Sequence, residues 1–566
     1  MAGRRRGRSQ TARKTAESAA NSAAIERITL VGVMLLLVAT LALVVFVRLR
    51  LADTPLERDE GEYAYAGQLI LEGIPPYALA YNMKFPGTYY AYGALMALFG
   101  QTPWGIRAGL LCLHVLTMTL VFSLGRRIVG TLAAGAGTCA FALLALDRWS
   151  MGVFAHATHF VVLPVVGGLL LLHPGLKDGR AWRLVGAGVL MGIAISMKQQ
   201  AIFFAPLAIG LAMWSARTAS PDARRREAWR RAALVAGGLT LALAALVGIL
   251  AAEGVLDRFW FWTFQYAAAY VSENTVSTGI AVFKMAWGYI TQANAWLWYA
   301  ALAGLALLFA ARWAAGSRIL LAGWLVAAGL SILPGFFFRP HYFIVLMPVA
   351  GLLVGVSLAT VDRALARMMG NRAARVASLL IFALGAGWYV KHDAYYFFQM
   401  TQTELVRAVY ETNPFLESPE IASYLNAHTT ADDRIAVLGS EPQIFFYANR
   451  KSATGYIYTY SLMEQQPYAA RMQEEMRREV EAARPRYLVF VGVANSWGTR
   501  PGADTRILTW ASEYTAKCYE QVGIVDIAPA GPATIRWDAD VAGYQPRFPS
   551  QVWTFRRRTT PDCQAQ

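Results

Sequence analysis

The stretch from Arg58 to Gly100 reads RDEGEYAYAGQLILEGIPPY (residues 58–77) and, after a short gap, KFPGTYYAYGALMALFG (residues 84–100). It lies between the first two long apolar segments of the chain. Charge held in or against a lipid bilayer is costly, so ionisable residues retained there are functional by default. This polar segment is therefore our first candidate for a site, with Asp59 as a candidate catalytic base.

The composition indicates a membrane protein. Of the 566 residues, 56% are hydrophobic and only 16% are charged. A soluble chain of this length would form several domains with many more charges. The apolar residues also occur in blocks of about 20, long enough to cross a hydrocarbon core of about 30 Å. We therefore predict a polytopic α-helical membrane protein.

The net charge of +16 has a pattern that argues against a nucleic-acid partner. The basic residues gather in the N-terminal tail and in short loops between apolar segments, as the positive-inside rule expects. The tail, residues 1–24, is Arg-rich and predicted to be disordered and cytoplasmic. Its tri-arginine resembles a twin-Arg signal, but a long apolar span with no small-residue cleavage site follows, which favours an uncleaved anchor.

The alternation of apolar blocks and Arg-rich loops predicts about eleven transmembrane helices, the first near residues 28–47. An odd number places the C-terminal part on the side opposite the N-terminus. We expect a membrane domain at residues 25–392, with its first outer loop at about residues 50–103, and an extracytoplasmic domain at residues 393–566. This topology suits the cytoplasmic (inner) membrane of a bacterium.

The C-terminal part changes in character. RIAVLG (residues 434–439) and RYLVFVG (residues 486–492) are typical of short buried strands, and residues 466–483 between them are helical in pattern. This alternation predicts a small α/β domain. Cys518 and Cys563 could pair there if the domain lies outside the cytoplasm.

The order of motifs resembles the first outer loop of the GT-C glycosyltransferases. DEGEYAYAGQLILEGIPPY, then KFPGTYYAYGALMALFG and WGIRAGLL, are similar to the bacterial relatives of protein O-mannosyltransferases and lipid A aminoarabinose transferases. The likeness covers about the first 200 residues, with a weaker echo at residues 339–348. The sequence departs from the family at KFPG, where two prolines are common, and at Arg58, where an aromatic residue is common.

The resemblance implies an inverting transfer of a sugar from a polyprenyl-phosphate donor to a hydroxyl acceptor on the outer face of the membrane. The acceptor class (lipid, glycan or protein) stays open. A hydroxyl is a poor nucleophile and needs a base, and Asp59 matches the family's catalytic position. Asp59 also stands where a helix N-cap would. Glu60 either orients the base, holds the sugar or is a solvated acid on the first turn of the helix, and Glu62 is expected on a solvated face.

Cations should surround the departing phosphate. Lys84 matches the lysine of the family's first outer loop. Lys198, at a turn between two apolar spans, is the second candidate, although it could simply extend to the interface. Arg339, His341 and Tyr342 form a third polar cluster, with interfacial anchoring as the alternative. Tyr63 could stack on a sugar or lie in the interface.

No cofactor is firmly implied. His156 and His159 are three residues apart and could begin a metal site, but no third ligand is evident, so a divalent cation stays open. Besides the glycosyltransferase, we considered a transporter or flippase for a lipid-linked sugar. Transporters place ionisable residues near the bilayer midplane within internal repeats, and neither feature is found. A scaffold whose outer domain binds a partner has no positive support.

Overall fold

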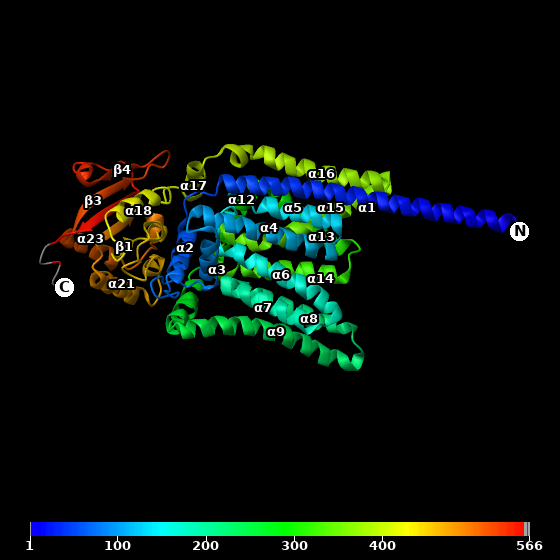
Figure 1. The fold of residues 1–566 in the computed structure, drawn as a ribbon, viewed down its shortest axis with the longest axis horizontal. Coiled ribbons are helices and arrows are strands. Elements are labelled where there is room, and N and C mark those ends of the chain that lie inside the picture. The colour runs from blue at the N-terminus through cyan, green and yellow to red at the C-terminus, as the bar shows by residue number, and fades with distance from the viewer. Residues whose placement is uncertain (1, 560–562, 564–566) are drawn as a thin grey trace.

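The structure is a computed structural model that describes residues 2–559 and 563. A bundle of long helices is followed by an α/β domain at one end (Figure 1). Each predicted span corresponds to a helix: α1 (Ala2–Arg50), α4 (Pro103–Ile128), α5 (Thr131–Leu144), α6 (Ala157–Asp178), α7 (Ala181–Met197), α8 (Phe204–Ser215), α9 (Pro221–Ala252), α13 (Ala295–Ala310), α14 (Ala315–Ser331), α15 (Met347–Met369) and α16 (Asn371–His392).

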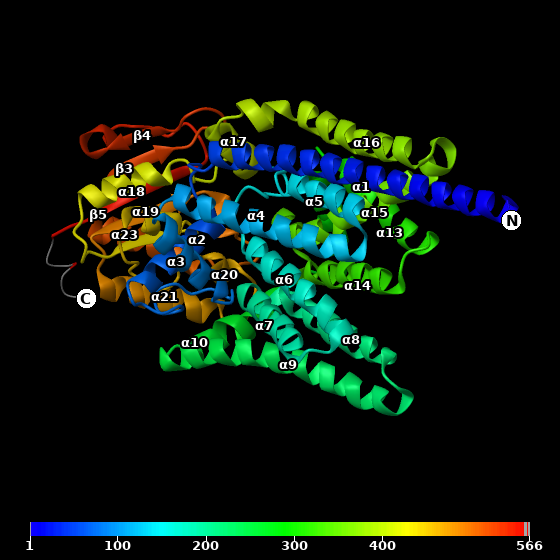
Figure 2. The same ribbon diagram turned by 45° about the vertical axis from the view of Figure 1, so that its right-hand side comes forward.

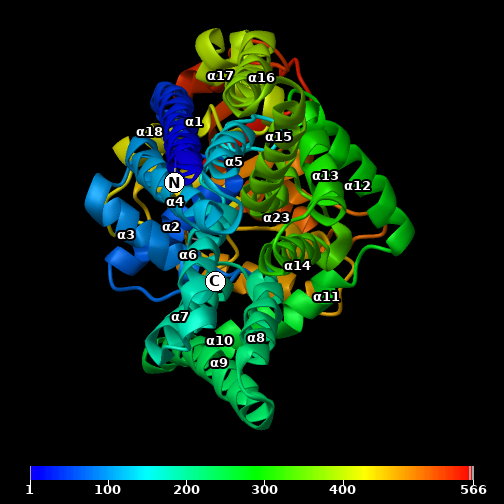
Figure 3. The ribbon, with the colours of Figure 1, turned by 90° about the vertical axis from the view of Figure 1, so that its right-hand side faces the viewer.

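Among the described residues, six helices are long and apolar enough to cross a membrane. A seventh span is formed if α12 (Val276–Thr291) and α13, bent by 111°, are taken together. The shorter apolar helices α5, α7, α8 and α14 pack among them. Seen end-on, α9 lies at one side of the bundle and α12 and α13 at another (Figure 3). The predicted multi-pass helical fold is confirmed, whereas the number of crossings stays a prediction.

The N-terminal tail differs from expectation. Residues 2–24, predicted to be disordered, continue the first span as part of α1, which projects beyond the bundle (Figure 1). The tail is rich in Ala and Arg, which are strong helix formers. A helix already nucleated by the apolar span gains one hydrogen bond for each residue added, so it can extend without a new nucleation cost.

Two short helices, α2 (Arg58–Leu71) and α3 (Gly87–Phe99), lie between the bundle and the C-terminal domain (Figure 2). Gly67 and Gly93 meet at their crossing, where a Cβ on Gly67 would lie 2.8 Å from the backbone nitrogen of Gly93. On its other side, α2 packs on α19 (Gln443–Ala448), and a Cβ on Gly61 would lie 2.7 Å from the nitrogen of Gln443. Glycines thus let α2 fit tightly between the two halves.

The connections at this end of the bundle are short and rich in aromatic residues. They comprise η1 (Gln199–Phe203), α10 (Leu256–Trp260), η3 (Phe261–Tyr266), α11 (Ala267–Val271), η4 (Pro334–Phe336), η5 (Pro340–Leu346), η6 (Tyr395–Gln399) and α17 (Gln402–Tyr410). At the opposite end, η2 (Ala216–Thr218) precedes the Arg-rich start of α9.

The C-terminal domain is built on a five-stranded sheet of order β1-β2-β5-β3-β4. The strands predicted from sequence, β1 (Ile435–Leu438) and β2 (Tyr487–Gly492), are confirmed and pair in parallel. β3 (Tyr519–Asp526), β4 (Thr534–Trp537) and β5 (Gln551–Arg557) add antiparallel pairs that we did not predict, because they lack a continuous apolar run. Helices α18 (Ser418–Ala427), α20 (Tyr460–Met463), α21 (Ala469–Ala483), α22 (Ala494–Trp497) and α23 (Arg506–Cys518) connect and cover the strands.

A disulfide bond joins Cys518, at the end of α23, to Cys563 near the C-terminus. The pairing left open by the sequence is therefore present in the structure. The domain boundaries at residues 24 and 392 stay predictions, although α16 ends at His392 and the first strand begins at Ile435.

Candidate active site

The start of α2 sets the position of Asp59. Glu57 is the N-cap: its Oε1 accepts a hydrogen bond from the Glu60 N–H at 2.8 Å, and Glu60 Oε2 accepts one from the Glu57 N–H at 3.3 Å. The interpretation of Asp59 as the cap is wrong, because Glu57 and Glu60 have the spacing of a capping box and already satisfy these donors. Asp59 is the second residue of the helix and faces the cavity described below.

Asp59 is held by Lys84. The Lys84 ammonium lies 2.8 Å from Asp59 Oδ1 and 2.7 Å from Glu62 Oε2, and Tyr89 donates to Glu62 Oε1 at 2.6 Å. Burial opposes ionisation of Asp59, but the Lys84 charge, helped by the His341 and His156 imidazoles, holds the pKa of Asp59 below its usual range. The expectation that Glu62 is solvated is wrong: its side chain is fully buried, because it provides the second carboxylate that fixes Lys84.

Glu60 lies behind the site and does not line the cavity. Its Oε2 accepts from Arg107 of α4 at 2.6 Å, and its Oε1 accepts from the backbone N–H of Ala155 at 2.7 Å. The side chain is fully buried, so the solvated alternative is excluded. Glu60 therefore joins α2 to α4 and to the loop before α6, which suits a positioning residue.

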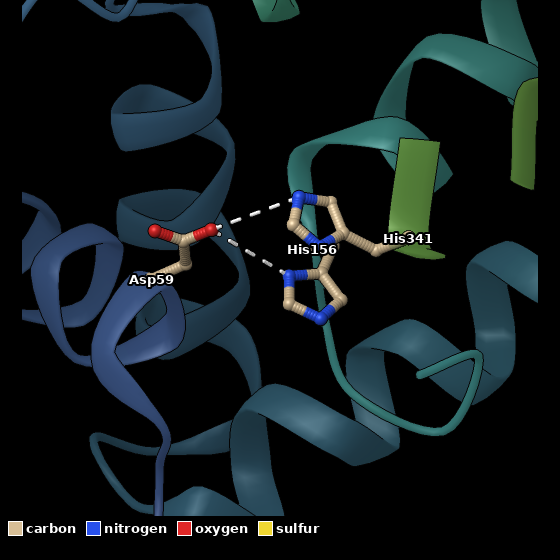
Figure 4. A group of neighbouring side chains, drawn as sticks. All are labelled: Asp59, His156 and His341. Atoms are coloured by element: carbon tan, nitrogen blue, oxygen red, sulfur yellow. Dashed lines mark ion pairs between the residues drawn. The ribbon is translucent and has the colours of Figure 1, made fainter. Parts of the chain in front are cut away.

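Two histidines face Asp59 from separate segments. Its Oδ2 lies 3.9 Å from His156 Nδ1 and 3.9 Å from His341 Nε2 (Figure 4). The two imidazole rings stack at 4.1 Å with an interplanar angle of 12°. The predicted pairing of His156 with His159 is wrong: His156 is the extended N-cap residue of α6, so helical spacing does not apply, and His159 does not line the cavity.

This arrangement contains a three-residue metal-ligand set. The ligand atoms of Asp59, His156 and His341 all lie within 4.8 Å of one another. Within the described part of the chain, neither ring nitrogen of His156 has a hydrogen-bond partner. Imidazole and carboxylate ligands suit divalent transition metals. These residues could therefore hold a divalent cation, while Lys84 already provides a positive charge beside Asp59.

Two further cations stand near this group. The Lys198 ammonium lies 3.7 Å from the ring centroid of Tyr342, and Tyr342 in turn packs edge-on against His341 at 4.9 Å. Burial lowers the pKa of Lys198 to about 7, with the Asp59 carboxylate opposing this shift and Lys84 adding to it. Arg339 is exposed at the same place. Among the described residues, neither Lys198 nor Arg339 forms a salt bridge with a carboxylate.

A cavity of about 630 Å³ brings these segments together. Of the residues predicted from sequence, Asp59, Lys84, Arg339, His341 and Tyr342 line it. Lys198 lies beside Tyr342 rather than in the lining. Tyr63 is buried behind the site, with its ring centroid 4.6 Å from the Lys84 ammonium, and is not among the lining residues.

The sequence analysis did not predict that residues of the C-terminal domain line part of the cavity. Tyr458, Tyr460, Glu464, Asn495 and Arg500 all line it. We found no catalytic motif in that domain, yet the run ATGYIYTY (residues 453–460) carries tyrosines at every second position. In an extended segment, side chains at every second position point to the same side, so this spacing is a signal that could have indicated a lining role.

Comparisons with known proteins agree with this architecture. Residues 83–236 match the family described as dolichyl-phosphate-mannose-protein mannosyltransferase. No curated protein matches the chain by sequence. Among solved structures, ArnT from Cupriavidus metallidurans bound to undecaprenyl phosphate superposes with a TM-score of 0.60 at 16% identity, covering 90% of this chain and 99% of that one.

The apo state of the same ArnT gives a TM-score of 0.56 at 18% identity, covering 92% of this chain and 97% of that one. At these identities the likeness concerns the fold. The fold spans nearly the whole length of both chains, which confirms the resemblance drawn from the first outer loop. The chain has the multi-pass helical membrane-protein fold of ArnT, and its residues 83–236 match the family described as dolichyl-phosphate-mannose-protein mannosyltransferase.

Proposed function

We propose that this protein is an inverting glycosyltransferase that moves a sugar from a polyprenyl-phosphate donor to a hydroxyl acceptor at the outer face of a bacterial cytoplasmic membrane. One observation carries the proposal. Asp59 and Lys84 of the first outer loop and the distant Arg339 line one cavity beside the ends of the membrane helices, and Lys198 lies against Tyr342 of its lining. A carboxylate base and a group of cations are what this transfer requires.

The donor phosphate is assigned to the cations that lack a carboxylate. Lys84 is shared between Asp59 and Glu62, whereas Lys198 and Arg339 have no such partner in the described chain. Charged donors of this kind form strong hydrogen bonds to phosphate oxygens. The matched ArnT structure is described as bound to undecaprenyl phosphate, and a similar ligand suits this end of the cavity.

Asp59 is the proposed general base. In the free protein the Lys84 charge keeps the pKa of Asp59 low, which makes it a weak base. The donor phosphodiester carries one negative charge, which near Lys84 offsets part of the lysine charge, so donor binding raises the basicity of Asp59 when the base is needed. Asp59 then accepts the proton of the acceptor hydroxyl, whose oxygen bonds to the anomeric carbon. The bond from this carbon to the phosphate oxygen breaks, and polyprenyl phosphate leaves.

The carboxylates of the site favour inversion. A retaining transfer needs two working carboxyl groups about 5 Å apart, one of them a nucleophile. Among the other carboxylates that line the cavity, Glu57 is engaged as the helix cap, Glu464 accepts from Tyr266, and Glu411 is exposed to solvent. Asp59 remains as the carboxylate that faces the reacting centre, which supports a single displacement. A divalent cation bound by Asp59, His156 and His341 would add positive charge beside the leaving phosphate.

The orientation rests on charge and on the disulfide bond. Arg126 and Arg127 lie in the last turn of α4 and the Arg224–Arg226 run lies near the start of α9, both at the end of the bundle opposite the cavity. Basic loops mark the cytoplasmic side. The Cys518–Cys563 disulfide lies in the domain at the cavity end, and disulfides persist in oxidising compartments. Both observations support a cavity on the outer face.

The transporter alternative gains no support. The ionisable residues of the cavity come from α2, from connecting segments at one end of the bundle and from the C-terminal domain, rather than from the middle of the membrane helices. Transporters use ionisable groups near the bilayer midplane on broken helices. The proposed partners are accordingly a polyprenyl-phosphate sugar, membrane lipids and an acceptor that is a lipid, a glycan or a protein.

The decisive test replaces the base without changing its shape. Asp59→Asn should lower transfer of label from a radiolabelled polyprenyl-phosphate sugar in membranes by about 100-fold or more, since general bases contribute about 10²–10⁴. The matched control is Asp53→Asn, an exposed aspartate in the same loop, which should transfer like the wild type. Retained transfer in Asp59→Asn membranes with normal protein levels would overturn the assignment.

A further inference from the structure

The acceptor half of the cavity is formed by two loops of the C-terminal domain. One runs from Gly455 to Tyr460, and the other, after β2, from Ala494 to Arg500. The Tyr460 hydroxyl donates to the carbonyl of Asn495 at 2.6 Å and accepts from Arg58 at 2.7 Å. The two loops are thus fixed to each other and to the start of α2, so their side chains form a rigid wall opposite Asp59.

Tyr458 is placed beside the reacting group. Its ring centroid lies 5.4 Å from the Lys84 ammonium, which is itself 2.8 Å from Asp59 Oδ1. Tyr460 packs perpendicular to it at 4.9 Å. Tyr458 is only half-buried, and its hydroxyl has no hydrogen-bond partner among the described residues. One aromatic ring and one hydroxyl are therefore available to a ligand whose reacting atom is at Asp59.

Three charged residues at this end of the cavity already have partners. Arg58 binds Glu441 at 2.7 Å, and Arg500 binds Glu273 at 3.2 Å. Glu464 accepts a hydrogen bond from Tyr266. A charged acceptor group that used one of these three residues would have to break its existing contact, whereas a neutral polar group would not. The remaining surface consists of tyrosine rings, hydroxyls and the exposed amide of Asn495.

A peptide acceptor fits this surface less well. Extended peptides are commonly bound by adding a strand to a free sheet edge. The β1 edge is covered, because the Ile435 N–H donates to the Lys451 carbonyl at 3.2 Å and the Ala453 N–H donates to the Ile435 carbonyl at 2.8 Å. The other edge strand, β4, lies on the side of the domain away from α2 (Figures 1 and 2).

We infer that the acceptor is a neutral glycan, one sugar ring of which packs on Tyr458 while Tyr460 and Asn495 help to form its binding wall. A sugar ring has an apolar C–H face that suits the negative face of an aromatic ring, and its hydroxyls suit the tyrosine hydroxyl and the amide. The inference rests on the proposed function and names its acceptor class. A hydroxyl of this sugar is the one that loses its proton to Asp59 and bonds to the donor's anomeric carbon.

Saturation-transfer NMR on the full-length protein in nanodiscs tests the inference. The glycan probes are mannotriose, maltotriose, galactotriose and arabinotriose, and a short threonine-rich peptide represents the protein alternative. We expect at least one trisaccharide to receive saturation from the wild type and Tyr458→Ala to weaken its binding about tenfold. Tyr458→Phe should fall between the two, because it keeps the ring and loses the hydroxyl.

The control variant is Tyr544→Ala. Tyr544 is a half-buried tyrosine of the same domain whose hydroxyl donates to Asp526 at 2.9 Å, outside the cavity, and its loss should leave the signal unchanged. Binding of undecaprenyl phosphate is measured for the wild type and every variant. A variant that still binds it has a correctly folded donor site. A wild-type protein that does not bind it contradicts the proposed function rather than the inference about the acceptor. Three results would each overturn the inference: saturation received by the peptide alone, saturation received by no trisaccharide, or trisaccharide saturation that is undiminished in Tyr458→Ala.

Discussion

At the scale of single residues, the surroundings of Lys198 turn an ordinary cation into one that titrates near neutral pH. Its ammonium lies against the Tyr342 ring, the residue is half-buried, and this burial lowers the pKa of Lys198 to about 7. Lys84, between two carboxylates, shows the opposite behaviour: burial alone would lower its pKa, but Asp59 and Glu62 raise it well above its ordinary value. The two lysines therefore differ in how they respond to pH.

This difference predicts a pH dependence of donor binding. A Lys198 whose pKa is about 7 is charged below that pH and neutral above it, so affinity for undecaprenyl phosphate should fall as pH rises from 7 to 9. Losing one charge-assisted hydrogen bond of about 1.5 kcal/mol corresponds to about a tenfold weaker Kd. Lys198→Arg stays charged, and any titration of the phosphate itself affects both proteins equally. Parallel Kd curves for the two proteins, measured by calorimetry, would contradict the role of Lys198.

At the scale of elements, α2 organises the site because its two faces are used differently. Gly67 packs against α3 and Gly61, on another side of the helix, packs against α19, while the start of the helix presents Asp59 to the cavity. Glu60 anchors this start to α4 through Arg107, a pair in which both side chains are almost completely buried. Removing one partner of a buried pair leaves an uncompensated buried charge, which destabilises a protein much more than replacing both partners with uncharged residues.

Arg107→Met should therefore destabilise the protein by about 3–5 kcal/mol, because Glu60 would remain buried without its cation. The double variant Arg107→Met, Glu60→Gln should be less destabilised than the single one. Arg126→Met, an exposed arginine near the other end of the same helix, serves as the control. Thermal unfolding in detergent measures all of these; an Arg107→Met midpoint equal to that of Arg126→Met would show that the pair does not hold α2.

At the scale of the whole molecule, the cavity lies where the helical bundle meets the C-terminal domain, and both contribute to its lining. Tyr81 of the first outer loop lies at this interface. Its ring contacts Trp262 and Tyr456, and its hydroxyl donates to Glu479 of α21 at 2.9 Å. These contacts require that the first outer loop and the C-terminal domain lie on the same side of the membrane. An odd number of crossings meets this requirement for a chain with a cytoplasmic N-terminus.

The topology can be checked with a reporter enzyme that is active only outside the cytoplasm. Fused after Lys391, at the end of α16, the reporter should be active, because this point precedes the C-terminal domain. Fused after Arg217, in the loop before α9, it should be inactive, since the basic residues that follow mark the inner side. An inactive fusion at Lys391 with a stable protein would show that the number of crossings is even.

The sequence alone determined the features that depend on local pattern. Apolar blocks of membrane-crossing length predicted the helical bundle, continuous apolar runs predicted β1 and β2, and the order of motifs around Asp59 and Lys84 predicted the family and part of the site. These signals lie within segments of a few tens of residues, where periodicity and hydrophobicity are sufficient.

Only the tertiary structure decided which residues meet. Glu62 was expected in solvent and is buried against Lys84; His156 was paired with His159 and instead stacks on His341, 185 residues further along the chain. Tyr458 and Tyr460 reach the cavity because two glycines let α2 pack closely between the bundle and the C-terminal domain. Contacts between distant segments depend on how the helices and the sheet dock together, and no local pattern in the sequence encodes that docking.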